Sequence, residues 1–169
     1  MTATPEDLYA RLDQLGISYK THHHEPVFTV EEARSVSREL DGGHSKNLFL
    51  KDKNGDLYLL VCLEETKVDL KSLRKKIGAK NLSFGKADLL IDTLGIEPGS
   101  VTPFSLINDT DNKVRVLLDS AMMQEVFLNF HPLINDKTTQ ISSEDLKRFI
   151  QDCGHDMTIL DPSAPAQAG

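Results

Sequence analysis

Residues 46–63 have the sequence KNLFLKDKNGDLYLLVCL, and this stretch determines the fold class more than any other. Two apolar runs, residues 47–52 and 56–63, flank Asn54-Gly55, a dipeptide typical of tight turns between antiparallel strands. The stretch therefore predicts a β-hairpin. Side chains alternate between the two faces of a strand, so Lys46 shares its face with Leu48 and Leu50. Its ammonium group either faces the mouth of a cavity or reaches water from the end of the strand.

Outside the hairpin, helix and strand signals come in runs. Capping residues, apolar spacing and closing glycines predict helices at residues 4–16, 29–40, 68–78, 85–95 and 142–154. Short apolar runs predict strands at residues 17–22, 102–108, 113–119, 125–130 and 156–161. Because strands outnumber helices and do not alternate with them strictly, we expect an α+β fold with a mixed sheet. Residues 1–160 are expected to form one domain, and the Pro/Ala-rich residues 161–169 a disordered tail.

The composition of the chain limits its environment. The 169 residues carry a net charge of −7, which argues against a protein that coats nucleic acid without selection, and DNA is not an expected partner. No apolar stretch approaches the roughly 20 residues that a membrane span needs, and the N-terminal residues lack the features of a signal peptide. The two cysteines form no CxxC motif. We therefore expect a cytoplasmic protein with no membrane partner.

Positive charge is concentrated in residues 67–86, here called the basic segment. It contains seven lysine and arginine residues and one acidic residue, so its local charge is seven minus one, or +6. The cations are Lys67, Lys71, Arg74, Lys75, Lys76, Lys80 and Lys86. The basic segment is either a solvated helix face or a site for phosphate groups.

Few residues suggest chemistry by themselves. Adjacent histidines on a strand point to opposite faces, so His22, His23 and His24 do not converge easily on one ion, and we expect no metal or other cofactor. The turn GSVTP, Gly99 to Pro103, either directs backbone amides at a carbonyl or anion or is a plain connection. His131 either lines a pocket or caps the end of a strand. No nucleophile or nucleotide-binding motif is present.

Five stretches occur together in a characteristic order. They are His24-x-PVFTVEEA, GGHSKNLFLKD (42–52), KVDLKSLRKKIG (67–78), LGIEPGSVTPFSLIND (94–109) and FHPLIND (130–136). Together they resemble the YbaK/ProX family, the editing domains related to the insertion domain of bacterial prolyl-tRNA synthetase, from about residue 5 to about residue 160. The chain is most similar to the free-standing deacylases that remove alanine from mischarged proline tRNA. Because it holds no synthetase catalytic domain, we expect it to act in trans.

The resemblance implies a fold and a set of site residues. The fold would be α+β, with a mixed, barrel-like sheet flanked by helices. Lys46 matches the family's functional lysine, Asn47 would lie beside the terminal ribose, and His131 matches a residue that lines the amino-acid pocket. The family's GxxxP loop corresponds to Gly99, Ser100, Val101, Thr102 and Pro103.

The resemblance also implies partners. The substrate would be aminoacyl-tRNA with a proline acceptor end, and prolyl-tRNA synthetase is a candidate partner. Contacts to the acceptor-stem backbone are expected from Lys51, Lys71, Arg74, Lys75 and Lys80. Family members differ in amino-acid specificity, so the motifs leave two alternatives to alanine removal: a deacylase for another mischarge such as Cys-tRNA(Pro), or a non-catalytic tRNA-binding module.

Overall fold

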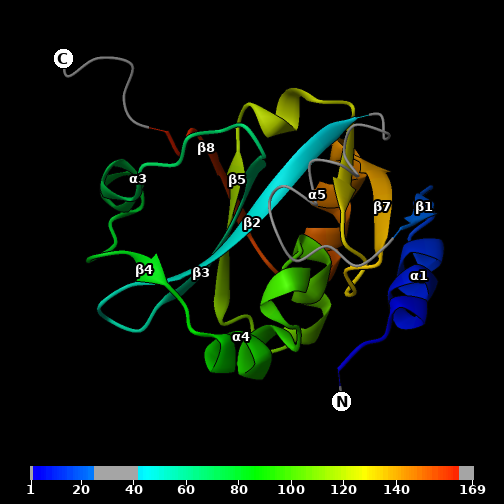
Figure 1. The fold of residues 1–169 in the computed structure, drawn as a ribbon, viewed down its shortest axis with the longest axis horizontal. Coiled ribbons are helices and arrows are strands. Elements are labelled where there is room, and N and C mark those ends of the chain that lie inside the picture. The colour runs from blue at the N-terminus through cyan, green and yellow to red at the C-terminus, as the bar shows by residue number, and fades with distance from the viewer. Residues whose placement is uncertain (1, 25–41, 164–169) are drawn as a thin grey trace.

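The computed structural model describes residues 2–24 and 42–163 (Figure 1). The predicted helix at residues 29–40 lies outside the described residues. The helices are α1 (Pro5–Gln14), α3 (Leu70–Ile77), α4 (Ala87–Leu94) and α5 (Ser143–Asp152), with short 3-10 helices η1 (Pro98–Ser100), η2 (Pro103–Asn108) and η3 (Met122–Gln124). The strands are β1 (Lys20–His23), β2 (Gly43–Lys51), β3 (Leu57–Leu63), β4 (Ser83–Phe84), β5 (Val114–Asp119), β6 (Phe127–Phe130), β7 (Lys137–Ser142) and β8 (Met157–Leu160).

The eight strands form one mixed sheet in the order β1-β7-β6-β2-β3-β5-β8, with β4 paired to β2. The pairs β1·β7, β6·β7, β2·β3 and β2·β4 are antiparallel, whereas β2·β6, β3·β5 and β5·β8 are parallel. The predicted α+β class and mixed sheet are confirmed. The expectation of a barrel-like shape needs correction, because β1 and β8 are at opposite ends of the strand order and the sheet does not close.

The predicted hairpin is present as β2 and β3. Its register pairs Ser45 with Leu63 and Lys51 with Leu57. The Asp52 carboxylate holds the turn: its Oδ1 accepts hydrogen bonds from the amides of Asn54 and Asp56, each at 2.9 Å. Gly55 has a φ of +88°, a conformation that a residue with a Cβ adopts only with strain.

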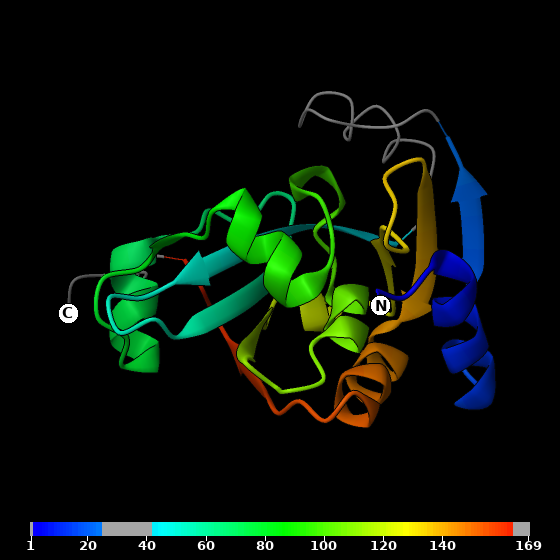
Figure 2. The same ribbon diagram turned by 90° about the horizontal axis from the view of Figure 1, so that it is seen from below.

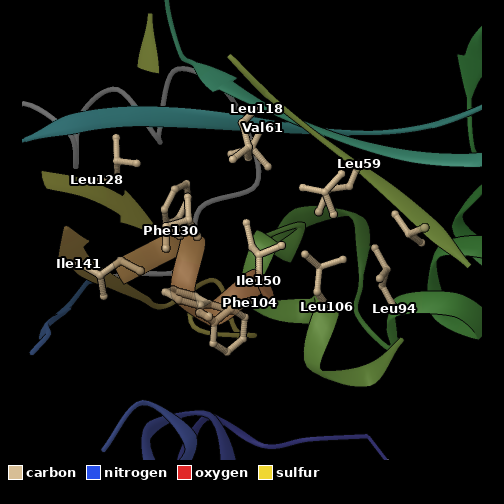
Figure 3. Packing of buried hydrophobic residues seen from close by; sticks show 14 of the residues in the cluster. Leu59, Val61, Leu94, Phe104, Leu106, Leu118, Leu128, Phe130, Ile141 and Ile150 are labelled. Carbon is tan, nitrogen blue, oxygen red and sulfur yellow. The ribbon is translucent and has the colours of Figure 1, made fainter. Parts of the chain in front are cut away.

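Both faces of the hairpin are buried, which explains its almost continuous apolar sequence. On one face Phe49, Leu59 and Val61 belong to the larger cluster, here called the main core, which also includes Phe104 and Phe130 (Figure 3). On the other face the buried cluster contains Leu50, Tyr58, Leu60, Cys62, Leu117 and Leu73 of α3. We call this second cluster the α3-side core. Successive side chains of β2 and β3 point to opposite faces and therefore belong alternately to the two cores.

Three local predictions differ from the structure. Residues 103–108, predicted as a strand, form helix η2, because Pro103 begins it and the Thr102 hydroxyl accepts a hydrogen bond from the Phe104 amide at 3.3 Å. Strands β4 and β7 were not predicted; β7 is polar and is held between β1 and β6. At the C-terminus, the Pro162 carbonyl accepts a hydrogen bond from the Asp69 amide. The ordered chain thus extends to at least residue 163, while residues 164–169 of the predicted tail lie outside the described part.

The longest helices in the described ranges, α1 and α5, have 10 residues each, and neither is long enough to cross a membrane.

Candidate functional site

One edge of β2 is left open in the middle of the strand. On the edge away from β3, strand β6 pairs only with Gly43 and His44, and β4 pairs only with Leu50 and Lys51. Among the described strands none covers the positions between these two contacts. The gap includes Lys46 and Asn47, which the sequence predicts as site residues.

Asn47 has several unpaired polar groups at this gap. The Phe49 carbonyl accepts a hydrogen bond from the Gly85 amide, so the backbone groups of Phe49 point to the open edge. Residues two apart in a strand direct their backbone groups to the same edge, so the N–H and C=O of Asn47 also point there. Its side-chain Oδ1 is buried and has no hydrogen-bond partner in the described chain. Buried polar atoms without partners are uncommon in folded proteins, so Oδ1 of Asn47 is a candidate contact for a ligand.

Lys46 is held on the opposite face of β2 from Asn47. Its neighbour across the hairpin is Cys62, a member of the α3-side core, and its Nζ donates a hydrogen bond to the Thr66 carbonyl at 2.6 Å. A protonated ammonium has three N–H donors, and the described residues occupy one of them. The lysine is thus fixed in position while keeping donors for an anion.

A buried carboxylate organises the turn that receives Lys46. Asp119 is only 1% exposed. Its Oδ2 accepts hydrogen bonds from the Leu63 amide at 3.1 Å and the Thr66 hydroxyl at 2.7 Å, and its Oδ1 accepts one from the Ala121 amide at 3.0 Å. Neither Asp119 nor Thr66 was predicted as a site residue, because 53 residues separate them and no motif joins them.

Cys62, between Lys46 and Asp119, is not a reactive thiol. Burial raises its pKa to about 12, even though the nearby Lys46 ammonium favours the thiolate. A nucleophilic cysteine needs a lowered pKa, so the geometry gives Cys62 a packing role.

The turn from Gly99 to Pro103 lies on the main-core side of the sheet. Val101 packs against the main core, Phe104 is part of it, and Thr102 is fully buried. The Ser100 amide donates to the Glu97 carbonyl, whereas no described residue accepts a hydrogen bond from the amides of Gly99, Val101 or Thr102. The turn therefore retains backbone amide donors that no described residue occupies.

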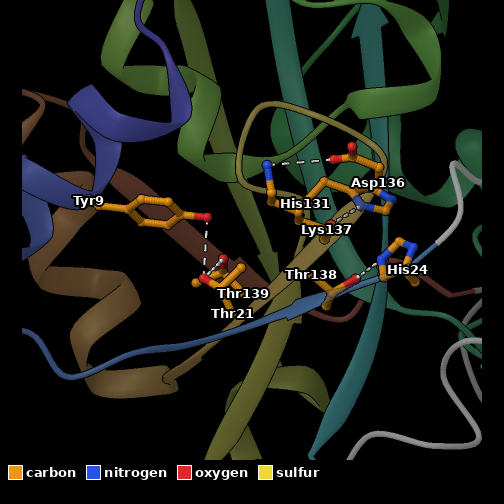
Figure 4. A network of polar contacts seen from close by, with 8 residues as sticks. All are labelled: Tyr9, Thr21, His24, His131, Asp136, Lys137, Thr138 and Thr139. Carbon is orange, nitrogen blue, oxygen red and sulfur yellow. Dashed lines mark hydrogen bonds and ion pairs between the residues drawn. The ribbon is translucent and has the colours of Figure 1, made fainter.

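His131 stands in a polar network where β6 ends and β7 begins (Figure 4). Its Nδ1 lies 3.0 Å from the Lys137 carbonyl, and since a carbonyl only accepts, Nδ1 carries the proton. The ring of His24 lies 6.2 Å away, and its Nε2 is 2.8 Å from the Thr138 hydroxyl. Burial lowers the pKa of His131; the bond to Lys137 opposes this shift and the nearby His24 adds to it. His24, noted in the sequence only as one of three adjacent histidines and as the start of the first family stretch, thus lies beside His131, together with Thr138, which the sequence did not single out.

The basic segment is largely exposed. Lys71 and Lys75 lie one turn apart on α3, and both are exposed, as is Lys80. Arg74 is half-buried and donates from Nη1 to the Asn81 side chain at 3.1 Å. Lys51 is half-buried at the end of β2. The exposed lysines are therefore available to a ligand, whereas Arg74 partly serves the local structure.

The structure groups the predicted residues by face. Asn47 and the 99–103 turn share the main-core side of the β2–β3 sheet, and Lys46 shares the α3 side with the basic segment. No hydrogen bond or ion pair between described residues joins Lys46, the 99–103 turn and His131 directly.

Comparisons with known proteins establish the family to which the chain belongs. The family model of the aminoacyl-tRNA editing domain matches residues 24–149. The prolyl-tRNA editing protein ProX of Acetoanaerobium sticklandii is 36% identical over 153 residues, covering 90% of this chain and 93% of ProX. The prolyl-tRNA synthetase associated domain-containing protein 1 of Mus musculus is 38% identical over 159 residues, covering 91% and 94%.

Solved structures show the same fold. A crystal structure described as that of a candidate trans-editing enzyme for prolyl tRNA synthetase superposes with a TM-score of 0.74, at 15% identity, over 98% of this chain and 99% of the other. The chain therefore belongs to the aminoacyl-tRNA editing domain family. This membership confirms the resemblance drawn from the five sequence stretches and makes the protein an enzyme that hydrolyses aminoacyl-tRNA.

We predict that His131 titrates below the ordinary histidine value of about 6.5 and is an Nδ1–H tautomer when neutral. Because its pKa is lower in the folded than in the unfolded chain, the unfolded state binds more protons, and the free energy of unfolding falls as the pH drops below about 6.5. A proton–nitrogen NMR titration of the imidazole resonances measures both properties. The variant His131→Gln should lose this part of the pH dependence; a titration midpoint at or above 6.5 would contradict the assignment.

Proposed function

We propose that the protein is a trans-acting deacylase that hydrolyses the aminoacyl ester of mischarged proline tRNA, with Ala-tRNA(Pro) as its substrate. The observation that carries the proposal is the gap in β2. Lys46 and Asn47 lie side by side there on opposite faces, and Asn47 has unpaired polar groups. Support also comes from the names of two relatives, a prolyl-tRNA editing protein and a prolyl-tRNA synthetase associated domain protein.

We assign the parts of the substrate to the two faces of β2 as follows. Lys46 lies on the side of the basic segment, which favours binding of the terminal phosphate over a role at the reacting carbonyl. Asn47 then contacts the terminal ribose from the main-core side. On that same side the 99–103 turn receives the ester, and its free amides stabilise the developing oxyanion.

The reaction needs no protein nucleophile. An aminoacyl ester is already activated, so positioning and charge stabilisation account for the catalysis. A water molecule, oriented by the 2′-hydroxyl of the substrate, attacks the ester carbonyl carbon. The bond between that carbon and the ribose oxygen breaks, and the ribose oxygen takes a proton. The products are the free amino acid and uncharged tRNA.

Selectivity for the mischarged amino acid follows from a second pocket that selects side chains by size. A synthetase pocket built for proline cannot strongly exclude the smaller alanine, because a missing methylene changes the binding free energy by only about 1–3 kcal/mol. A second pocket that admits alanine and excludes proline corrects the error. His131, held by Lys137 and beside His24, forms part of the wall of this pocket.

Two rival functions make different predictions. A deacylase for Cys-tRNA(Pro) would share the same ester site and differ only in the amino-acid pocket. A non-catalytic tRNA-binding module would bind the acceptor end without turnover. The unpaired donors of the 99–103 turn favour an enzyme, because simple binding of tRNA does not require donors at the ester.

A panel of proline tRNAs charged with alanine, cysteine or proline distinguishes these functions. We expect the largest kcat/KM for alanine and no measurable hydrolysis of the proline ester, because the pocket excludes the larger ring. The measurement follows the loss of radiolabelled aminoacyl-tRNA over time. His131→Ala should broaden the accepted side chains. Faster hydrolysis of the cysteine ester would establish the first rival, and binding with no hydrolysis the second.

Replacing Lys46 should remove most of the activity. We expect Lys46→Ala to lower kcat/KM by roughly 30-fold or more, because losing one partner of a hydrogen-bonded charge pair costs about 2–5 kcal/mol, and Lys46→Arg to retain part of the activity through its charge. Thermal unfolding should stay close to that of the unmodified protein. Lys113 is exposed, and Lys113→Ala, which removes the same charge as Lys46→Ala, serves as the control. Unchanged turnover in Lys46→Ala would exclude this lysine from the mechanism.

The exposed lysines of the basic segment should determine the salt dependence of binding. Neutralising Lys71, Lys75 and Lys80 together should weaken tRNA binding and reduce the slope of log Kd against log salt by about two to three, since each phosphate contact contributes roughly 0.7–0.9. Filter binding between low and physiological salt measures the slope. A triple alanine variant of Lys20, Lys113 and Lys147 has the same net charge and serves as the control. An identical slope in both variants would show that the basic segment is only a solvated face.

A further inference from the structure

Phe84 is a large aromatic side chain that the fold exposes in a fixed position. It is 60% exposed, although it belongs to the sheet as one of the two residues of β4. Figure 1 shows β4 beside the end of β2, between α3 and α4. A single exposed apolar side chain is common on protein surfaces, so what distinguishes Phe84 is the way it is held and the charges around it.

The backbone around Phe84 is tightly packed. The Gly85 amide donates a hydrogen bond to the Phe49 carbonyl at 2.9 Å. A Cβ on Gly85 would lie 2.4 Å from Cδ2 of Phe49, whose ring is 5% exposed in the main core. Strand β4 therefore approaches β2 as closely as a glycine permits. Phe84 is thus presented by the sheet and not by a loose loop.

The surroundings of Phe84 are cationic. Residues 70–87 contain no aspartate or glutamate, and Lys80 and Lys86, close to Phe84 in sequence, are both exposed. Other exposed apolar side chains have acidic neighbours in sequence: Glu125 precedes Val126 and Phe127, and Asp161 follows Ile159 by two residues. An aromatic side chain among lysines suits a nucleic acid, since the base stacks on the ring and the phosphates contact the cations.

Phe84 also shares a face with the candidate lysine. Its register partner is Leu50, and register partners in a sheet point to the same side. Leu50 and Lys46 are four residues apart on one face of β2, so about 13 Å of strand separates them at 3.3 Å per residue. This distance is longer than one nucleotide. A strand of RNA whose terminal phosphate contacts Lys46 would therefore bring an earlier base to Phe84.

We propose that Phe84 is a stacking platform for an unpaired base that precedes the terminal adenosine in the 3′ end of the substrate tRNA. The inference rests on the proposed function, because it takes the position of the terminal phosphate from Lys46. It adds a binding site outside the ester pocket. The platform recognises a base by its π face, and it therefore improves the placement of the 3′ end without reading a particular sequence.

A comparison of two substrates tests the platform. Alanyl-tRNA(Pro) contains the preceding bases, whereas 2′(3′)-O-alanyl-adenosine ends before them. We expect Phe84→Ala to lower kcat/KM about 10-fold or more on the tRNA, within the range for one lost base stack, and to leave the rate on alanyl-adenosine unchanged. Phe84→Tyr should restore activity on the tRNA, whereas Phe84→Leu, apolar but not aromatic, should not. Ile159→Ala removes another exposed apolar side chain, on β8, and is the control.

A second readout does not depend on turnover. A 3′-end oligonucleotide with 2-aminopurine in place of the base before the terminal adenosine, or one position earlier, should lose fluorescence on binding. The loss should persist in Phe84→Tyr and disappear in Phe84→Ala. Equal effects of Phe84→Ala on both substrates, full activity of Phe84→Leu, or unchanged quenching in Phe84→Ala would overturn the platform. Absence of hydrolysis by the unmodified protein would instead refute the proposed function, and the fluorescence would still decide the role of Phe84.

Discussion

Strand β2 packs against an apolar core on each face, but the described strands pair with it along only part of one edge, and the candidate site lies at this gap. A central strand normally pairs along both edges, because buried backbone groups need hydrogen-bond partners. In the described structure β6 and β4 contact β2 at its two ends and stop short of its middle. The unpaired backbone of Asn47 at this gap is stabilised by the hairpin bonds to β3 and by two apolar cores.

The lysine at this gap is positioned by a chain of polar contacts through the sheet. Asp119 lies at the end of β5, and its carboxylate fixes the backbone after β3 and the hydroxyl of Thr66. The Thr66 carbonyl then receives the Lys46 ammonium. A lysine side chain has four rotatable bonds and loses much entropy when fixed by a ligand. Because Thr66 already fixes the Lys46 side chain before a ligand binds, less entropy is lost on binding. This is the usual benefit of preorganisation.

Much of the fold could be predicted from the sequence because the signals are local. The hairpin follows from Asn54-Gly55 between apolar runs, and the capped helices follow from short side chains at their first residues. Helix η2 was misassigned because the residues from Thr102 to Asn108 are apolar enough for a strand, and only the cap shows otherwise. Strand β7 was missed because its polar residues are stabilised by neighbours from distant parts of the chain.

The site could be predicted in part for the same reason. The motifs identified Lys46, Asn47 and the turn at residues 99–103 as candidates, but not their distribution over two faces. That distribution depends on which face packs against α3, a tertiary contact. The open edge depends on where β6 and β4 end, and the support from Asp119 crosses 53 residues. Neither fact has a local signature in the sequence.

The register of the hairpin is therefore a functional constraint as well as a structural one. Because side chains alternate, a slip of one residue would move Lys46 to the main-core side and Asn47 to the α3 side. The Lys46 ammonium would then enter the apolar main core, and the side-chain amide of Asn47 would take its place beside Thr66. Asp52 prevents this slip by binding the amides of Asn54 and Asp56, and Gly55 supplies the φ that the two-strand connection requires. A turn roughly 20 Å from Lys46, at about 3.3 Å per residue along β2, thus determines which face of the strand carries Lys46 and which carries Asn47.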